Sequence, residues 1–303
     1  MGKLRNWQLF AVCVLTWGTT WYAITWQIGA VSAEVGVALR FAIAGGLALA
    51  IAAANGQRLR FAAADHALFA LQGALMYGLA YVMVYHAERY LVSGLVAVGY
   101  SATPLVSGIA ARLLFRAPLS TRFLLGGLVG LAGVALIFWP EFGKAAGHAR
   151  TAIGAALTVA ALLISAAGAL AASRNRPRGL PFWSSIGFGM LYGALTCALV
   201  ALARGESFVL PATAVWWGSL LYLAIAGSVL TFACYLTLQD RIGPGPAGTI
   251  GVMTPLLALV VSMFFEGYRP DAVTAFGALL AIVGNGLMLT PGAPVRVAAA
   301  ATE

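Results

Sequence analysis

Apolar runs of about 20 residues, separated by short polar breaks, constrain the fold of this chain more than any other feature. A helix rises 1.5 Å per residue, so a run of this length crosses the ~30 Å hydrocarbon core of a bilayer. Only 9% of the 303 residues are charged, against about 25% in soluble domains. We therefore predict an all-α polytopic membrane protein with ten transmembrane helices. The predicted spans cover residues 7–28, 33–54, 66–87, 92–114, 122–139, 151–172, 182–203, 216–238, 246–266 and 271–290.

The polar breaks indicate how the chain lies in the membrane. If the N-terminus is cytoplasmic, twelve of the 18 Lys and Arg residues fall in inner connections and five in outer ones, while Arg40 lies inside a span. Positive residues concentrate on the cytoplasmic side of membrane proteins. We therefore expect both termini in the cytoplasm. The same clustering in short loops explains the net charge of +9, so we expect no nucleic-acid partner.

The first apolar run follows the basic segment MGKLRN, as the apolar part of a signal peptide would. This run is too long for a signal peptide, and no small-residue cleavage site separates it from the rest. We expect it to be retained as the first span.

A repeated tripeptide divides the chain into halves. Thr103-Pro104-Leu105 lies in the fourth span, and Thr254-Pro255-Leu256 lies in the ninth. Proline within a helix frees the carbonyl four residues earlier, here that of Tyr100 or Gly251. Paired, proline-interrupted spans in corresponding halves indicate a transporter binding site. We predict that both prolines break their helices and act as hinges, and that residues 1–140 and 141–303 form two inverted repeats of five spans.

Several short motifs resemble one family of transporters. They are Trp17-Gly18, Leu39-Arg40-Phe41, the two prolines above and Phe264-Phe265-Glu266. Together they resemble the EamA branch of the drug/metabolite transporter superfamily, and most of all its bacterial aromatic amino-acid exporters. The resemblance covers nearly the whole chain and implies a multi-pass protein of the bacterial inner membrane. The family often carries Glu at the end of both span four and span nine, but Phe115 stands at the first of these positions.

Enzymatic and ATP-driven functions lack their motifs. The sequence contains no phosphate-binding G-x-x-x-x-G-K-[ST] and no H-E-x-x-H, so we expect no cofactor and no metal. All nine acidic residues lie at or beyond the ends of spans, whereas proton-coupled pumps usually bury a carboxylate or a histidine. We expect movement down a concentration gradient, or proton coupling through a less obvious group such as His86.

The candidate substrate site combines one cation with aromatic side chains. Arg40 is the one cation well inside a span, and a charge there is a functional candidate. It either attracts a substrate carboxylate or anchors its own helix. Trp17 and Tyr77 lie near mid-span, and Tyr81 continues the stripe of Tyr77 at helical spacing. Further candidates at a similar depth are Tyr100, Ser101, Ser165, Tyr192, Ser228 and Thr231. The alternative for each of these residues is helix packing.

These features favour a secondary transporter that exports aromatic or large apolar amino acids. The alternatives are an exporter of drugs or other metabolites and a membrane scaffold that transports nothing. The patterns Gly126-x-x-x-Gly130 and Gly277-x-x-x-Ala281 suit close helix contact, either between the halves or in a dimer. The expected partners are an amino-acid substrate and the lipid bilayer, and the protein is expected to be a monomer or a homodimer.

Overall fold

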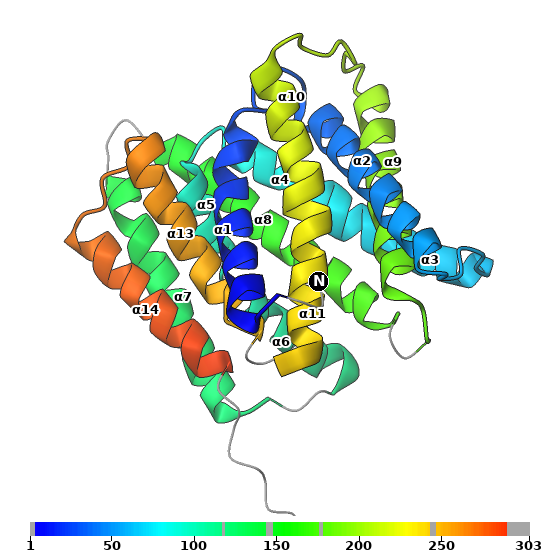
Figure 1. The fold of residues 1–303 in the computed structure, drawn as a ribbon. Coiled ribbons are helices and arrows are strands. Elements are labelled where there is room, and N and C mark those ends of the chain that lie inside the picture. Colours follow the sequence, from blue (N-terminus) through cyan, green and yellow to red (C-terminus); the bar gives the residue numbers. More distant parts are fainter. Residues whose placement is uncertain (1–3, 117–118, 144–147, 176–177, 243–246, 290–303) are drawn as a thin grey trace, which may run out of the picture.

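The computed structural model describes residues 4–116, 119–143, 148–175, 178–242 and 247–289, and this part of the chain is nearly all helical (Figure 1). Its non-helical pairing is one isolated bridge between Ile28 and Val31. Seven of the helical stretches are long and apolar enough to cross a membrane, and two shorter apolar helices follow them. The helices outside the interrupted spans are α1 (Asn6–Thr25), α2 (Ala33–Ala54), α7 (Thr121–Gly143), α8 (His148–Ser173), α9 (Phe182–Ala203), α13 (Ile250–Phe265) and α14 (Ala272–Leu289).

Two spans contain π-helical segments that the sequence did not indicate. The third span consists of α3 (Ala63–Gln72), η1 (Gly73–Leu79) and α4 (Ala80–Ala87). The eighth consists of α10 (Ala214–Leu221), η2 (Tyr222–Leu230) and α11 (Thr231–Ile242). A π-helix widens the turn by one residue and often marks a functional site.

The two prolines expected to break helices behave differently. In span four, α5 (Ser93–Tyr100) ends before Pro104, and α6 (Thr103–Phe115) begins with that proline in its first turn. The Thr103 hydroxyl donates to the Tyr100 carbonyl at 2.5 Å, so this carbonyl has a partner within the chain. In span nine, α13 continues through Pro255. The prediction of a break at Pro255 is therefore wrong. A proline in the second turn of a helix has little helix before it to disturb.

A third proline corrects the end of the fifth span. The apolar pattern predicts that the fifth span ends before Pro140, but α7 runs through this residue to Gly143. Proline is tolerated in membrane helices where neighbouring groups satisfy the freed carbonyl. The predicted ranges of α2 and α9 match the observed bounds.

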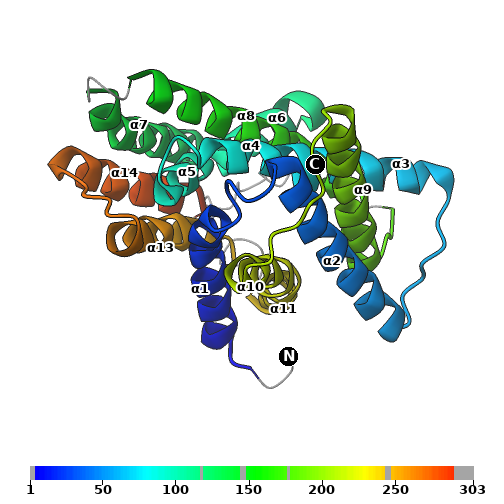
Figure 2. The same ribbon diagram turned by 90° about the horizontal axis from the view of Figure 1, so that it is seen from above.

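The helices form two flanking groups with a central set between them (Figure 2). Seen from above, α7, α13 and α14 lie on one side, and α2, α3 and α9 lie on the other. Between these groups, α1 and the α10–α11 column face α4 and α8. We call the end of the molecule at the top of Figure 1, where α1 ends and α2 begins, the upper end.

The small-residue patterns lie inside the molecule, where α7 packs along α14. A Cβ on Gly284 would lie 2.2 Å from the backbone nitrogen of Gly130, and one on Gly133 would lie 2.4 Å from that of Ala281. From Gly130 to Gly133 on α7, the contacted residue on α14 moves back from Gly284 to Ala281, so the two helices are antiparallel. The patterns therefore pack the two halves of one chain together.

Candidate functional site

A cleft of about 530 Å³ opens at the upper end of the molecule. Segments far apart in the sequence contribute to it: the α1–α2 connection, the start of α2, the end of α4 and the residues after α9. Its lining residues are Gly29, Ala30, Val31, Ser32, Glu34, His86, Arg89, Arg204, Glu206, Ser207 and Val209. Most of these lining residues are polar.

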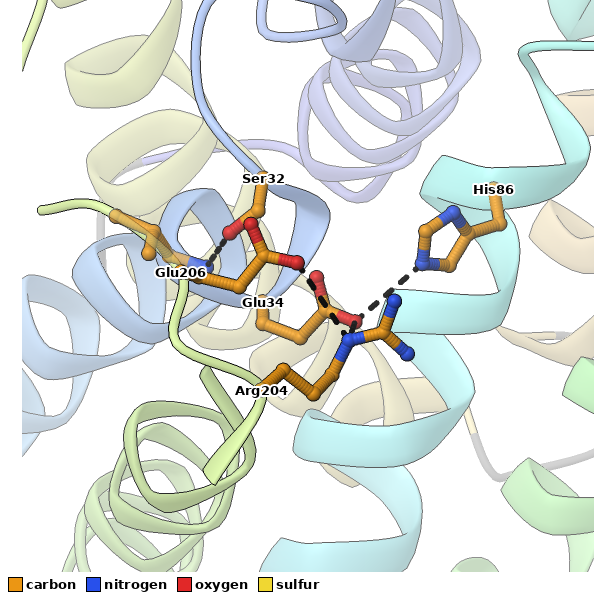
Figure 3. A network of polar contacts seen from close by, with 6 residues as sticks. Ser32, Glu34, His86, Arg204 and Glu206 are labelled. Atoms are coloured by element: carbon orange, nitrogen blue, oxygen red, sulfur yellow. Dashed lines mark hydrogen bonds and ion pairs between the residues drawn. The ribbon is translucent and has the colours of Figure 1, made fainter. Parts of the chain in front are cut away.

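Ion pairs centred on Glu34 cross this cleft (Figure 3). The Oε1 atom of Glu34 lies 3.5 Å from His86 Nε2 and 3.8 Å from Arg204 Nε, and Arg204 Nε lies 3.5 Å from Glu206 Oε1. Glu34 is almost completely buried. It stands in the first turn of α2, where the helix dipole favours a negative charge, and the Ser32 hydroxyl caps the same helix. The network ties α2 to α4 and to the end of α9.

Arg40 lies on α2 below the cleft and is 2% exposed. Its Nε and Nη1 atoms have no hydrogen-bond partner among the described residues. Its Cζ atom lies 4.7 Å from the centroid of the Tyr81 ring and 5.1 Å from that of Phe41. A buried guanidinium without an anionic partner costs several kcal/mol, and cation–π contacts offset only about 2 kcal/mol of it. Arg40 is therefore positioned to bind an anion.

Other polar groups without partners border α2 or interact electrostatically with Arg40. They are the Gln27 Oε1 atom, the Tyr85 hydroxyl and both carboxylate oxygens of Glu88, all without a hydrogen bond in the described part of the chain. A Cβ on Gly36 would lie 3.5 Å from the Tyr85 ring and 3.8 Å from Gln27 Oε1, so both border α2. We call Gln27, Arg40, Tyr85 and Glu88 the buried polar set. It combines acceptors with one cation.

The aromatic candidates separate into three contacts. Tyr77 and Tyr81 both pack against Phe41, with centroids 5.3 and 4.8 Å away. Tyr100 packs against Trp21 at 5.5 Å, and its hydroxyl donates to the Ala161 carbonyl. Only Tyr81 of the candidate tyrosines also contacts the Arg40 guanidinium through its ring.

Trp17 and Arg40 both approach Gly227 of η2. Its indole nitrogen donates to the Gly227 carbonyl at 3.0 Å, and its ring packs against Phe232 and Tyr235. A Cβ on Gly227 would lie 3.8 Å from Arg40 Nη2. The structure therefore brings Trp17 and Arg40 to the same residue of η2. Among the described residues, the Trp17 ring packs against aromatic side chains of α11 and not against those of span three.

The remaining hydroxyl candidates do not converge on Arg40. Ser228 and Thr231 donate to carbonyls five residues earlier, those of Leu223 and Ala226, so they satisfy the η2 backbone. The hydroxyl of Tyr192 lies 3.1 Å from His66 Nδ1, between α3 and α9.

Two serines lie near the interrupted span four. Ser165 interacts with the hydroxyl of Tyr100. Ser101 is buried without a hydrogen bond in the described residues and borders a small void beside Pro255. Both serines lie beside the interruption of span four.

Burial of acidic residues is the main feature that sequence reasoning missed. Glu34 and Glu88 follow or precede apolar runs, and this position suggested that they face solvent. The structure leaves them 2% and 8% exposed. The spacing of Tyr81, Tyr85 and Glu88 was the available signal, because side chains four and three residues apart share a helix face.

Glu266 has a structural partner at the upper end. Its carboxylate accepts hydrogen bonds from the Ser93 backbone nitrogen at 3.1 and 3.2 Å, from the Ser93 hydroxyl at 2.5 Å and from the Ser262 hydroxyl. The Ser262 hydroxyl also accepts from the Gly94 nitrogen. These four residues, which we call the Glu266 clamp, join the start of α5 to the end of α13. At the corresponding first-half position, Phe115 offers no carboxylate.

Comparison with known proteins identifies the family. Residues 6–139 and 152–290 both match the EamA-like transporter family. The chain belongs to this EamA-like transporter family. The resemblance drawn from the sequence motifs is thus confirmed at the level of the family, and the chain is a membrane transporter by family. No group of three His, Cys, Asp or Glu side chains that could hold a metal occurs among the described residues.

Two relatives and one solved structure place this EamA-like transporter more closely. Protein PecM of Dickeya dadantii (strain 3937) is 27% identical over 263 residues, covering 87% of this chain and 84% of the relative. The uncharacterized transporter YvbV of Bacillus subtilis (strain 168) is 23% identical over 305 aligned positions, covering 98% and 95%. A structure titled "Crystal structure of protein" matches with a TM-score of 0.67 and 19% identity over 93% of this chain and 96% of that one. At this identity the likeness supports the fold alone.

Proposed function

We propose that this EamA-like transporter exports amino acids with aromatic or large apolar side chains across the bacterial inner membrane. The observation that carries the proposal is the buried guanidinium of Arg40, which has two nitrogens without partners and stacks on Tyr81. A carboxylate is the natural ligand of such a group. The rings of Phe41 and Tyr81 beside it provide an apolar surface for a side chain.

Two internal comparisons support an architecture of ten spans in two inverted repeats, with halves 1–140 and 141–303. The family matches the chain twice. Helix pairs also correspond: α1 packs on α13 as α8 packs on α5 and α6. In addition, α2 packs on α9 and α7 packs on α14, and each of these pairs joins spans with the same place in the two halves. Antiparallel packing of α7 with α14, the last spans of the two halves, agrees with inversion of the second half. In this arrangement the interruption before Pro104 serves as a hinge in the first half. Pro255, inside the continuous helix α13, has the corresponding place in the second half.

The positive-residue distribution supports cytoplasmic termini, so that the upper end and its cleft face outward. A cysteine at Ser207 is then expected to react with impermeant reagents added outside intact cells, and one at Asn55 only after the membrane is opened. Both positions are exposed. The opposite labelling would place the termini outside and the cleft on the cytoplasmic side, and would refute the proposed orientation.

Transport by purified protein in liposomes tests the proposed function. We expect phenylalanine efflux to exceed that of phenethylamine, which has the same ring and ammonium group but lacks the carboxylate. The change Arg40→Gln removes the charge-assisted hydrogen bonds, worth about 1.5–3 kcal/mol. We therefore expect a loss of phenylalanine transport at low concentration of roughly 10- to 150-fold, with little change for phenethylamine.

Arg58→Gln is the matched control, since Arg58 is exposed and also stacks on a ring, that of Phe61. It is expected to transport phenylalanine like the parent. A panel of apolar drugs and other metabolites tests the alternative substrate class. If no amino acid leaves loaded liposomes faster than it leaves protein-free ones, amino-acid export is refuted, and if no solute does, the protein is a scaffold.

A further inference from the structure

Glu88 is a buried acid whose carboxylate does no structural work in the described part of the chain. It follows α4 directly, is 8% exposed, and has no hydrogen bond to either oxygen. By contrast, the Glu266 carboxylate at the same end accepts several hydrogen bonds. A buried carboxylate that accepts no hydrogen bonds is costly to keep ionised.

Two charged groups from other helices act on Glu88. Arg40 approaches from α2, and Glu266 approaches from the end of α13. Other charged groups at this end have partners of their own. His86 and Arg204 pair with Glu34, and Arg150 of α8 donates to the Arg89 carbonyl and stacks on Tyr90. On α4 itself, the Tyr85 hydroxyl interacts electrostatically with Glu88. The surroundings thus hold one cation and one anion for Glu88.

The balance of these surroundings favours the protonated acid. Burial raises the pKa of the Glu88 carboxyl well above 4.5, the Glu266 carboxylate raises it further, and Arg40 opposes both. A neutral Glu88 also leaves the Arg40 guanidinium without a counter-ion. That state suits the arrival of a carboxylate from outside the protein.

An amino acid brings a cation as well as a carboxylate. Once its carboxylate binds Arg40, the adjacent ammonium group has to find acceptors within a few ångströms, since desolvation without them is costly. The acceptors without partners in this region belong to the buried polar set: Gln27 Oε1, the Tyr85 hydroxyl and Glu88. Of these, only Glu88 can supply a full negative charge.

We propose that Glu88 holds a proton in the empty transporter and exchanges it for the ammonium group of the substrate. The inference rests on the function proposed above. On binding, the Glu88 O–H bond breaks, the proton passes to water, and the carboxylate accepts hydrogen bonds from the ammonium group, which keeps all of its own protons. His86 and Arg89, on either side of Glu88 in the sequence, line the open cleft, which gives a proton from the outer side a route back to Glu88. When the substrate leaves, Glu88 takes up a proton again, so the cycle exchanges one proton for one zwitterion.

Proton release on binding tests this exchange directly. Purified protein in weakly buffered detergent solution receives phenylalanine while a pH indicator dye and isothermal calorimetry record proton release and binding. We expect close to one proton per bound phenylalanine between the ordinary pKa of Glu and the raised one. Glu88→Gln, which mimics the protonated acid, is expected to release none and to lose pH-gradient-driven accumulation in liposomes. Glu88→Asp is expected to restore release.

Asp65→Asn is the matched control, because Asp65 is a carboxylate paired with Arg178 away from the cleft. It is expected to release protons like the parent. Parent protein that binds phenylalanine without proton release at any pH between 5 and 9 refutes the exchange and leaves the proposed function standing. Equal release by Glu88→Gln refutes the assignment to Glu88. Absence of phenylalanine binding in the parent refutes the function and this inference together.

Discussion

Removing the Glu266 carboxylate is expected to loosen the upper end of the molecule by an amount that the structure allows us to estimate. The carboxylate caps the first turn of α5 through the Ser93 nitrogen and binds the hydroxyls of Ser93 and Ser262. A helix cap contributes about 1 kcal/mol. A hydrogen bond to a charged group contributes roughly 1.5–3 kcal/mol. These contributions overlap, so we expect Glu266→Ala to lower the free energy of unfolding by about 3 kcal/mol.

Glu266→Gln is expected to cost about half as much, because the amide keeps one acceptor oxygen and replaces the other with a donor. Unfolding in mixed micelles, followed by tryptophan fluorescence, measures both changes. Asp65→Asn serves again as the control, since its exposed pair with Arg178 contributes at most about 1 kcal/mol. If Glu266→Ala unfolds within about 0.5 kcal/mol of the parent, the clamp does not hold α5 to α13, and the reasoning from its hydrogen bonds fails.

Three further predictions concern substrate contact, helix packing and pH. Tyr81→Ala is expected to weaken binding of phenylalanine about 2- to 10-fold more than binding of alanine, because a ring contact contributes about 0.5–1.5 kcal/mol; calorimetry with both amino acids checks this, and equal losses would make Tyr81 a packing residue. Gly284→Ala is expected to destabilise the protein by about 1–3 kcal/mol, because its Cβ would lie 2.2 Å from the Gly130 backbone. Gly46→Ala is the control in the same unfolding assay: no heavy atom lies within 4 Å of its Cβ, so this change is expected to be neutral or stabilising. Because burial raises the pKa of the Glu88 carboxyl above its value of 4.5 in the unfolded chain, stability is expected to fall as pH rises from that value. Thermal unfolding of Glu88→Gln across pH 4 to 9 should lack this part of the decline.

The helices were predictable because their signal is long and local. An apolar run such as residues 182–203 has to satisfy its backbone within itself in lipid, and α9 occupies those residues. The π-helical segments were not predictable in this way, because they differ from an α-helix by one residue per turn and not by composition. At Gly73, where η1 begins, a Cβ would lie 2.2 Å from the Gly189 carbonyl. The local geometry therefore depends on α9, more than a hundred residues away.

The candidate site was predictable only where a residue was unusual for its position. Arg40 stood out because a charge inside an apolar run is rare, and the structure leaves it buried with two nitrogens that have no hydrogen bond to the described residues. Glu88 did not stand out, since an acid directly after a span normally faces water. Its burial results from neighbours that come from α2 and from the end of α13, and no local pattern records such contacts.

The two π-helical segments also bear on the history of the chain. A π-segment within an α-helix corresponds to one inserted residue. The segments η1 and η2 begin at residues 73 and 222, a separation of 149, close to the 151 residues between Pro104 and Pro255. If the two halves descend from one ancestral gene, a single insertion before its duplication accounts for both segments, whereas insertion afterwards requires two matching events. On this view the widened turn was already present in an ancestor of half the present length. Two copies of that ancestor then had to assemble in opposite orientations.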